Sequence, residues 1–97
     1  CPPVEEEIVD LKKLTQMLAD TKAIGLLAKL GLRKDIKIIL KRLEAYHDGK
    51  GKYLLDELEE QYDLLMMKIA SQLQDRDLML HRHLCNAWLE IWNDLSD

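Results

Sequence analysis

Leucine-rich stripes at helical spacing constrain this chain more than any other feature. The clearest stripe recurs at intervals of three and four residues over five turns: Leu55, Leu58, Tyr62, Leu65, Ile69 and Leu73. The charged residues of the same stretch fall between these positions. This pattern is typical of an amphipathic helix with one buried face, so we predict a helix over about residues 53–74.

The same spacing predicts helices over about residues 4–20, 33–47 and 77–95, and a short connecting helix over about 22–30. Whether residues 53–95 form two helices or one long helix is left open by the sequence.

Several residues suit the ends of these helices. Pro3 fits a first helical position, and the acidic run 5–7 complements the positive end of a helix dipole. Asp20 or Thr21 can cap the short helix, and Gly31 fits the left-handed residue that often ends one. The two glycines of "HDGKGK" at 47–52 predict a turn, and Asp75 or Asp77 can cap the last helix.

Composition agrees with an all-α fold. The 97 residues include twenty Leu and seven Ile but only two Val and no Phe, so residues that favour strands are scarce. The length suits one domain, residues 1–97. We predict an up-and-down bundle of four main helices plus the short connector. The apolar runs are too short to predict a transmembrane helix.

Charge is unevenly distributed along the chain. The net charge is −4, but residues 29–52 carry eight bases against three acids, and residues 53–97 carry three against ten. These parts either neutralise each other inside the bundle or leave a basic face for an anionic partner. The overall acidity argues against nucleic acid. The candidate partner-binding residues of the basic helix are Arg33, Lys34, Lys37 and Lys41.

The last predicted helix has a second apolar stripe beside its leucines. His81, Cys85, Trp88 and Trp92 share this stripe. We favour the interpretation that the two tryptophans fill the core, and the alternative is that they anchor a partner. The broad apolar face could also form a homodimer.

Residues for metal or phosphoryl chemistry are sparse. His81 and Cys85 are four residues apart and could present two ligands to one ion, which is an incomplete set and a weak metal candidate. His47, Lys50 and Gly51 resemble the H-x-x-K-G pattern of phosphotransfer helical bundles, but glycine at 49 favours a turn. No phosphate-loop, nucleophile-elbow or zinc-protease motif is present, so the sequence identifies no catalytic residue and no cofactor.

Cys1 bears on the cellular compartment in which the protein works. A chain that begins with cysteine resembles a mature bacterial lipoprotein, and this resemblance implies lipid attachment at Cys1 and a periplasmic or membrane-anchored location. The alternative is an arbitrary chain boundary and a cytoplasmic protein. A disulfide between Cys1 and Cys85 is then conceivable, with a stabilisation of about 4 kcal/mol.

These observations favour a non-catalytic helical bundle, a small bacterial envelope lipoprotein that acts by binding another protein. The alternative functions are a cytoplasmic bundle that binds a metal or small ligand and a phosphotransfer-like bundle that uses His47.

Overall fold

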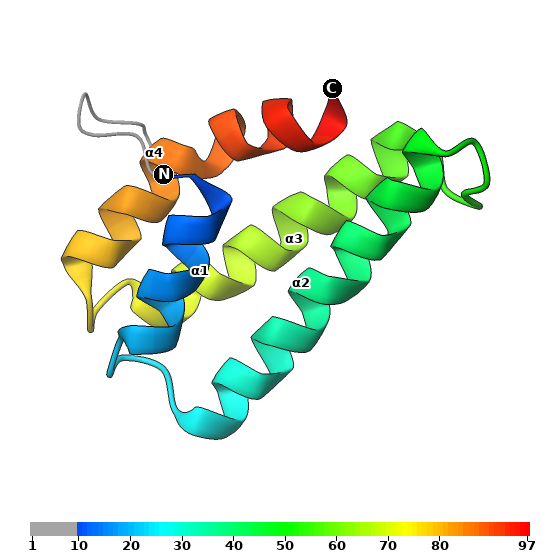
Figure 1. Cartoon of the computed structure of the whole chain (residues 1–97). Helices are drawn as coiled ribbons and strands as arrows, with labels where there is room; N and C mark the ends of the chain where they lie inside the picture. Colours follow the sequence, from blue (N-terminus) through cyan, green and yellow to red (C-terminus); the bar gives the residue numbers. More distant parts are fainter. Residues whose placement is uncertain (1–9) are drawn as a thin grey trace.

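A computed structural model describes residues 10–97, which form four helices and no strand (Figure 1). The helices are α1 (Leu11–Asp20), α2 (Leu26–His47), α3 (Leu55–Leu73) and α4 (Leu78–Ser96). They are joined by short turns and pack as an up-and-down bundle, so the predicted all-α fold is confirmed.

The packing order of the helices leaves one side of the bundle open. α3 packs against both α2 and α4, and α1 packs against α4. α1 and α2 are not among the pairs in close contact, although they follow each other in the sequence. The side of the bundle between α1 and α2 therefore lacks the helix-to-helix packing that closes the other sides.

The core is built from the stripes seen in the sequence. The largest fully buried side chains come from three of the four helices: Leu14, Leu58, Ile69, Leu73 and Leu84. The α3 stripe from Leu58 to Leu73 is buried at each of its positions, and α3 begins and ends within two residues of the predicted bounds. The apolar stripe of α3 therefore packs against both α2 and α4 and stabilises the position of each.

The prediction of a separate short helix that ends at Gly31 is wrong. α2 is continuous through Gly31, and Gly49 is the only residue between 10 and 97 with a positive φ. Leu32 is buried, and it begins a stripe that continues through Ile36, Ile39 and Leu43. Burial along this stripe outweighs the cost of about 0.5–1 kcal/mol for glycine in a helix interior.

The predicted cap at Asp20 or Thr21 is also wrong, because α2 begins at Leu26 with Gly25 as its N-cap. Thr21 instead ends α1.

The first helix begins later than predicted. Asp10 has extended backbone, and its Oδ1 accepts a hydrogen bond of 2.8 Å from the backbone N–H of Lys13, so it is the N-cap of α1. This cap satisfies a donor of the first turn and fixes the start at Leu11. Pro3 and the acidic run 5–7, on which the earlier start depended, lie outside the described residues.

Residues 53–95 contain two helices, and Asp77 separates them. Asp77 Oδ1 accepts from the backbone N–H of Leu80 at 3.1 Å, which caps α4. Its Oδ2 accepts from the hydroxyl of the buried Thr21 at 2.7 Å. One carboxylate thus starts α4 and ties it to the end of α1.

Candidate functional site

The candidate site is a groove of about 660 Å³ between α1 and the first half of α2. Most of its lining is aliphatic. Its apolar lining residues are Leu11, Leu18 and Ala19 of α1 and Leu26, Leu30, Leu32 and Ile36 of α2. We call this feature the α1–α2 groove. Its volume and apolar lining are typical of a binding site rather than of an ordinary protein surface.

Exposed leucines mark one wall of the groove. Leu26 is 75% exposed and Leu30 is 54% exposed, and both face the groove from the start of α2. Leu27 follows on the same turn and is exposed as well. Single exposed leucines are common in soluble proteins, whereas Leu26 and Leu30 line one groove together.

A small pit opens beneath the groove toward the core. It measures about 30 Å³ and shares Leu11, Thr15, Leu18 and Ile36 with the groove. Its far side is formed by core residues of α3, including Tyr62 and Ile69. The groove floor is therefore apolar down to the centre of the bundle.

Basic residues edge the groove. Lys12 of α1 and Lys29 and Arg33 of α2 are among its lining residues, and none of the described lining residues is acidic. Lys29 Nζ donates a hydrogen bond of 2.7 Å to the backbone carbonyl of Ala19, which links α2 to the last turn of α1. Lys12 and Arg33 are exposed and stand on opposite walls.

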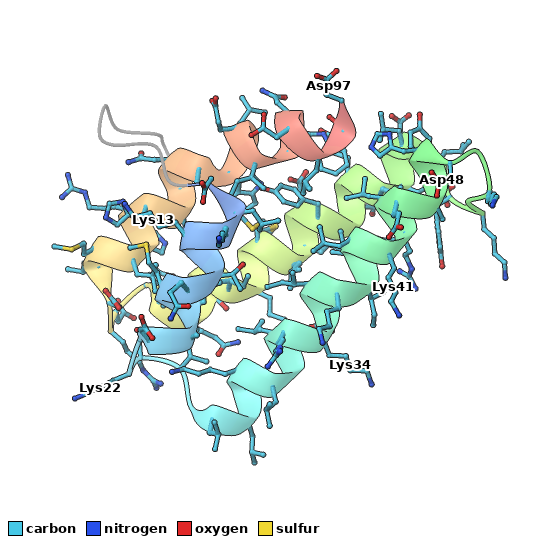
Figure 2. The ribbon with its side chains drawn as sticks, viewed as in Figure 1. Lys13, Lys22, Lys34, Lys41, Asp48 and Asp97 are labelled. Carbon is cyan, nitrogen blue, oxygen red and sulfur yellow. The ribbon has the colours of Figure 1, made fainter. Side chains whose placement is uncertain are left out.

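Of the four predicted basic partner-binding residues, the structure places only Arg33 at the groove. Lys34, Lys37 and Lys41 are exposed elsewhere on α2. Figure 2 shows Lys34 and Lys41 pointing outward from α2, away from the bundle. The basic helix therefore has two basic surfaces, and one of them edges the groove.

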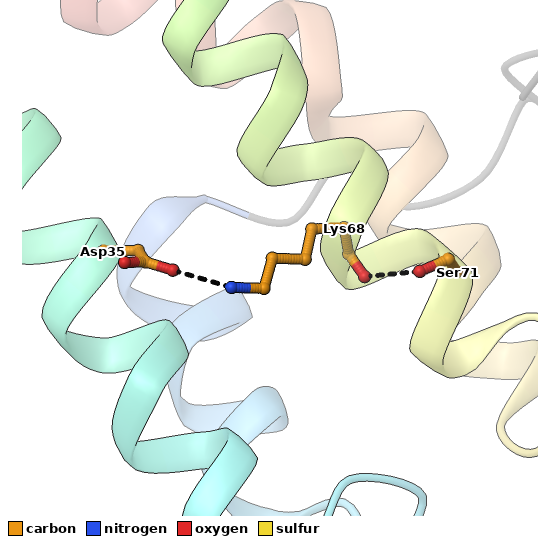
Figure 3. A network of polar contacts seen from close by, with 3 residues as sticks. All are labelled: Asp35, Lys68 and Ser71. Atoms are coloured by element: carbon orange, nitrogen blue, oxygen red, sulfur yellow. Dashed lines mark hydrogen bonds and ion pairs between the residues drawn. The ribbon is translucent and has the colours of Figure 1, made fainter.

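The other side of α2 is bridged to α3 by polar contacts. Asp35 and Lys68 form an ion pair with 3.1 Å between Oδ2 and Nζ, and the Lys68 carbonyl accepts from the Ser71 hydroxyl (Figure 3). Arg42 donates to the Gln61 side chain at 2.6 Å. The ion pair neutralises an acid of α2, and Gln61 is uncharged, so these contacts leave the basic charge of α2 in place.

Both tryptophans pack into the core. Trp92 is buried, and its ring lies 5.2 Å from the ring of Tyr62. Trp88 is half-buried, and its Nε1–H donates to Asp63 Oδ1 at 2.9 Å. The Tyr62 hydroxyl donates to the Trp88 carbonyl, and burial raises the pKa of Tyr62. This arrangement agrees with the core interpretation of the indoles, and their role as partner anchors stays a prediction.

The weak metal candidates do not form a ligand set. His81 Nδ1 lies 3.8 Å from Cys85 Sγ, but Cys85 is held in a disulfide and has no thiolate to offer a metal. Across residues 10–97, no group of three His, Cys, Asp or Glu side chains could hold a metal ion. The other cysteine of the chain, Cys1, the predicted site of lipid attachment, lies outside the described residues.

His47 is the last residue of α2 rather than an interior helical residue. Its Nε2 lies 2.8 Å from the backbone carbonyl of Leu95 and joins the ends of α2 and α4. Lys50 and Gly51 follow in the turn, where Gly51 closely approaches the backbone of Tyr46. One of the two ring nitrogens is thus engaged in a structural contact, and the phosphotransfer role stays a prediction.

Sequence reasoning missed the groove because it assigned residues 22–30 to a connector. The sequence does contain a sign of the groove. Leu26, Leu30 and Arg33 lie on one helical face, and the buried stripe that begins at Leu32 lies on another.

No helix within residues 10–97 combines the length and apolar character needed to cross a bilayer. No protein-family model, curated protein or solved structure significantly matches the chain.

Proposed function

We propose that this protein is a non-catalytic helical bundle that binds another protein, and that the α1–α2 groove receives an amphipathic helix of that partner. The observation that carries the proposal is the apolar groove at the one unpacked side of the bundle, with Leu26 and Leu30 exposed along it. An apolar helix face in a groove is a recurrent mode of peptide recognition.

The dimensions of the groove suit a helix. Its α2 wall runs from Leu26 to Ile36, which at 1.5 Å per residue is roughly 15 Å or about three helical turns. A partner helix of that length would lie between α1 and α2, which pack less closely on each other than the other neighbouring helices do. The pit beneath the groove offers space for the end of a large aliphatic side chain.

The test uses a designed peptide and two matched variants. The probe is a fluorescently labelled helical peptide with leucine on one face and glutamine on the other. Leu30→Glu changes the groove, and Leu64→Glu is the control because Leu64 is a similarly exposed leucine, at 58%, on α3 outside the groove. We expect Leu30→Glu to weaken binding at least about tenfold, since it places a charge in an apolar contact, and Leu64→Glu to bind like the parent.

Three results would contradict the proposal. The first is equal binding by Leu30→Glu and Leu64→Glu, and the second is no binding to any form. The third is concentration-dependent sedimentation that Leu30→Glu abolishes, because the groove would then be filled by a second copy of the chain. Backbone amide shifts on peptide addition should be largest in α1 and the first half of α2.

We further propose that the protein works in an extracytoplasmic compartment. Lipid attachment at Cys1 would leave Cys85 without an in-chain disulfide partner, so this proposal does not require the lipid. The disulfide at Cys85 supports this location, because disulfides persist in oxidising compartments. The chain has only two cysteines, so the sulfur of Cys1 can carry a lipid or share an in-chain disulfide with Cys85, but not both. Intact mass of the protein from its native membrane fraction distinguishes acylation from a disulfide, and an unmodified thiol at both cysteines would contradict the proposed location.

A further inference from the structure

We infer that the α1–α2 groove selects partner helices whose apolar face is flanked by acidic residues on both sides. The inference rests on the proposed function and specifies the chemistry of the partner.

Among the lining residues within 10–97, the charges at the groove are of one sign and stand on both walls. Lys12 lies on the α1 wall and Arg33 on the α2 wall, with Lys29 bonded across one end. A helix that buries a leucine stripe in the groove has two rows of flanking residues, one beside each wall. Carboxylates in those rows would meet Lys12 on one side and Arg33 on the other, as flanking charges do in coiled coils.

The charge on the rest of the molecule favours a basic partner helix over an acidic one. The net charge of the chain is −4, and residues 53–97 carry ten acids against three bases. Long-range attraction would therefore favour a basic ligand. A preference for an acidic helix can arise only from groups near the groove, since salt screens charges beyond about 8–10 Å.

The experiment compares three peptides that share one leucine face and carry glutamate, glutamine or lysine in the flanking rows. We expect the glutamate peptide to bind about tenfold tighter than the lysine peptide at about 0.1 M salt, with the glutamine peptide between them. Added salt should reduce the difference. Arg33→Glu should bring the two affinities close together, and Lys12→Glu should do the same from the other wall.

Lys41→Glu is the matched control, because Lys41 is exposed on the same helix but does not line the groove. It makes the same change in net charge as Arg33→Glu and should keep the preference for glutamate. All three substitutions are at exposed positions, and far-UV circular dichroism checks that each variant keeps the helical fold.

The outcomes separate this inference from the proposed function. Equal affinity for the three peptides, with binding still lost in Leu30→Glu, would overturn the acidic preference and leave the groove function standing. An equal effect of Lys41→Glu and Arg33→Glu would also overturn it, since the preference would then follow total charge. Failure of every peptide to bind would refute the proposed function itself.

Discussion

Gly31→Ala should stabilise the protein. Gly31 is exposed inside α2, it has no positive φ, and a Cβ added there would meet no atom within 4 Å. Alanine is preferred to glycine in a helix interior by about 0.5–1 kcal/mol, mainly because it reduces the freedom of the unfolded chain. For a domain of this size the gain corresponds to a rise in Tm of roughly 2–8 °C.

Gly49→Ala is the matched control. A Cβ at Gly49 would also meet no atom within 4 Å, but its φ is +73°, in the left-handed region. An L-residue there costs about 1–2 kcal/mol, so this variant should be less stable than the parent. The same methyl group is added in open space in both variants, and the opposite signs isolate the effect of the backbone conformation.

Urea unfolding followed by far-UV circular dichroism measures both changes in the free energy of unfolding. A lower stability for Gly31→Ala would refute the reasoning. It would mean that Gly31 ends a helix in a left-handed conformation, and that α2 consists of two helices.

Three further predictions concern the tertiary contacts. Asp77→Ala removes the α4 cap and the bond from Thr21, so it should cost about 1–2 kcal/mol in urea unfolding, whereas alanine at the exposed Asp75 should change little. Because burial raises the pKa of Tyr62, the folded protein keeps a proton that the unfolded chain releases near pH 10. Stability should therefore fall as pH rises above about 10, and Tyr62→Phe should show a smaller fall; identical pH profiles would contradict this. Reduction of the disulfide at Cys85 should lower the urea midpoint, and an unchanged midpoint would show that the disulfide does not constrain the unfolded chain.

The sequence predicts a helix and its buried face correctly where a single apolar stripe runs without interruption. The α3 stripe is uninterrupted, and its residues are buried as expected. The end of α3 and the start of α4 could not be settled from sequence, because an Asp such as Asp77 is tolerated on a helix surface. Its other carboxylate oxygen accepts from Thr21, which is 56 residues away in the chain, and the sequence gives no sign of that contact.

Gly31 shows where local signals mislead. Glycine followed by leucine is typical of a helix end, but Leu32 packs into the core in the same register as Ile36 and Ile39. Tertiary burial therefore overrides a local preference of about 1 kcal/mol. The groove escaped prediction for a related reason, since it depends on α1 packing against α4 instead of α2, and no single segment encodes that choice.

The placement of α1 bears on how the chain folds. α2, α3 and α4 contact their sequence neighbours across short turns, so their pairing closes only small loops. α1 docks on α4, the helix farthest from it in sequence, and this step closes the largest loop of the described chain. In the reduced protein we therefore expect α2, α3 and α4 to pair before α1 docks, so that the binding surface is created by the last docking step and is the first part lost when the protein opens.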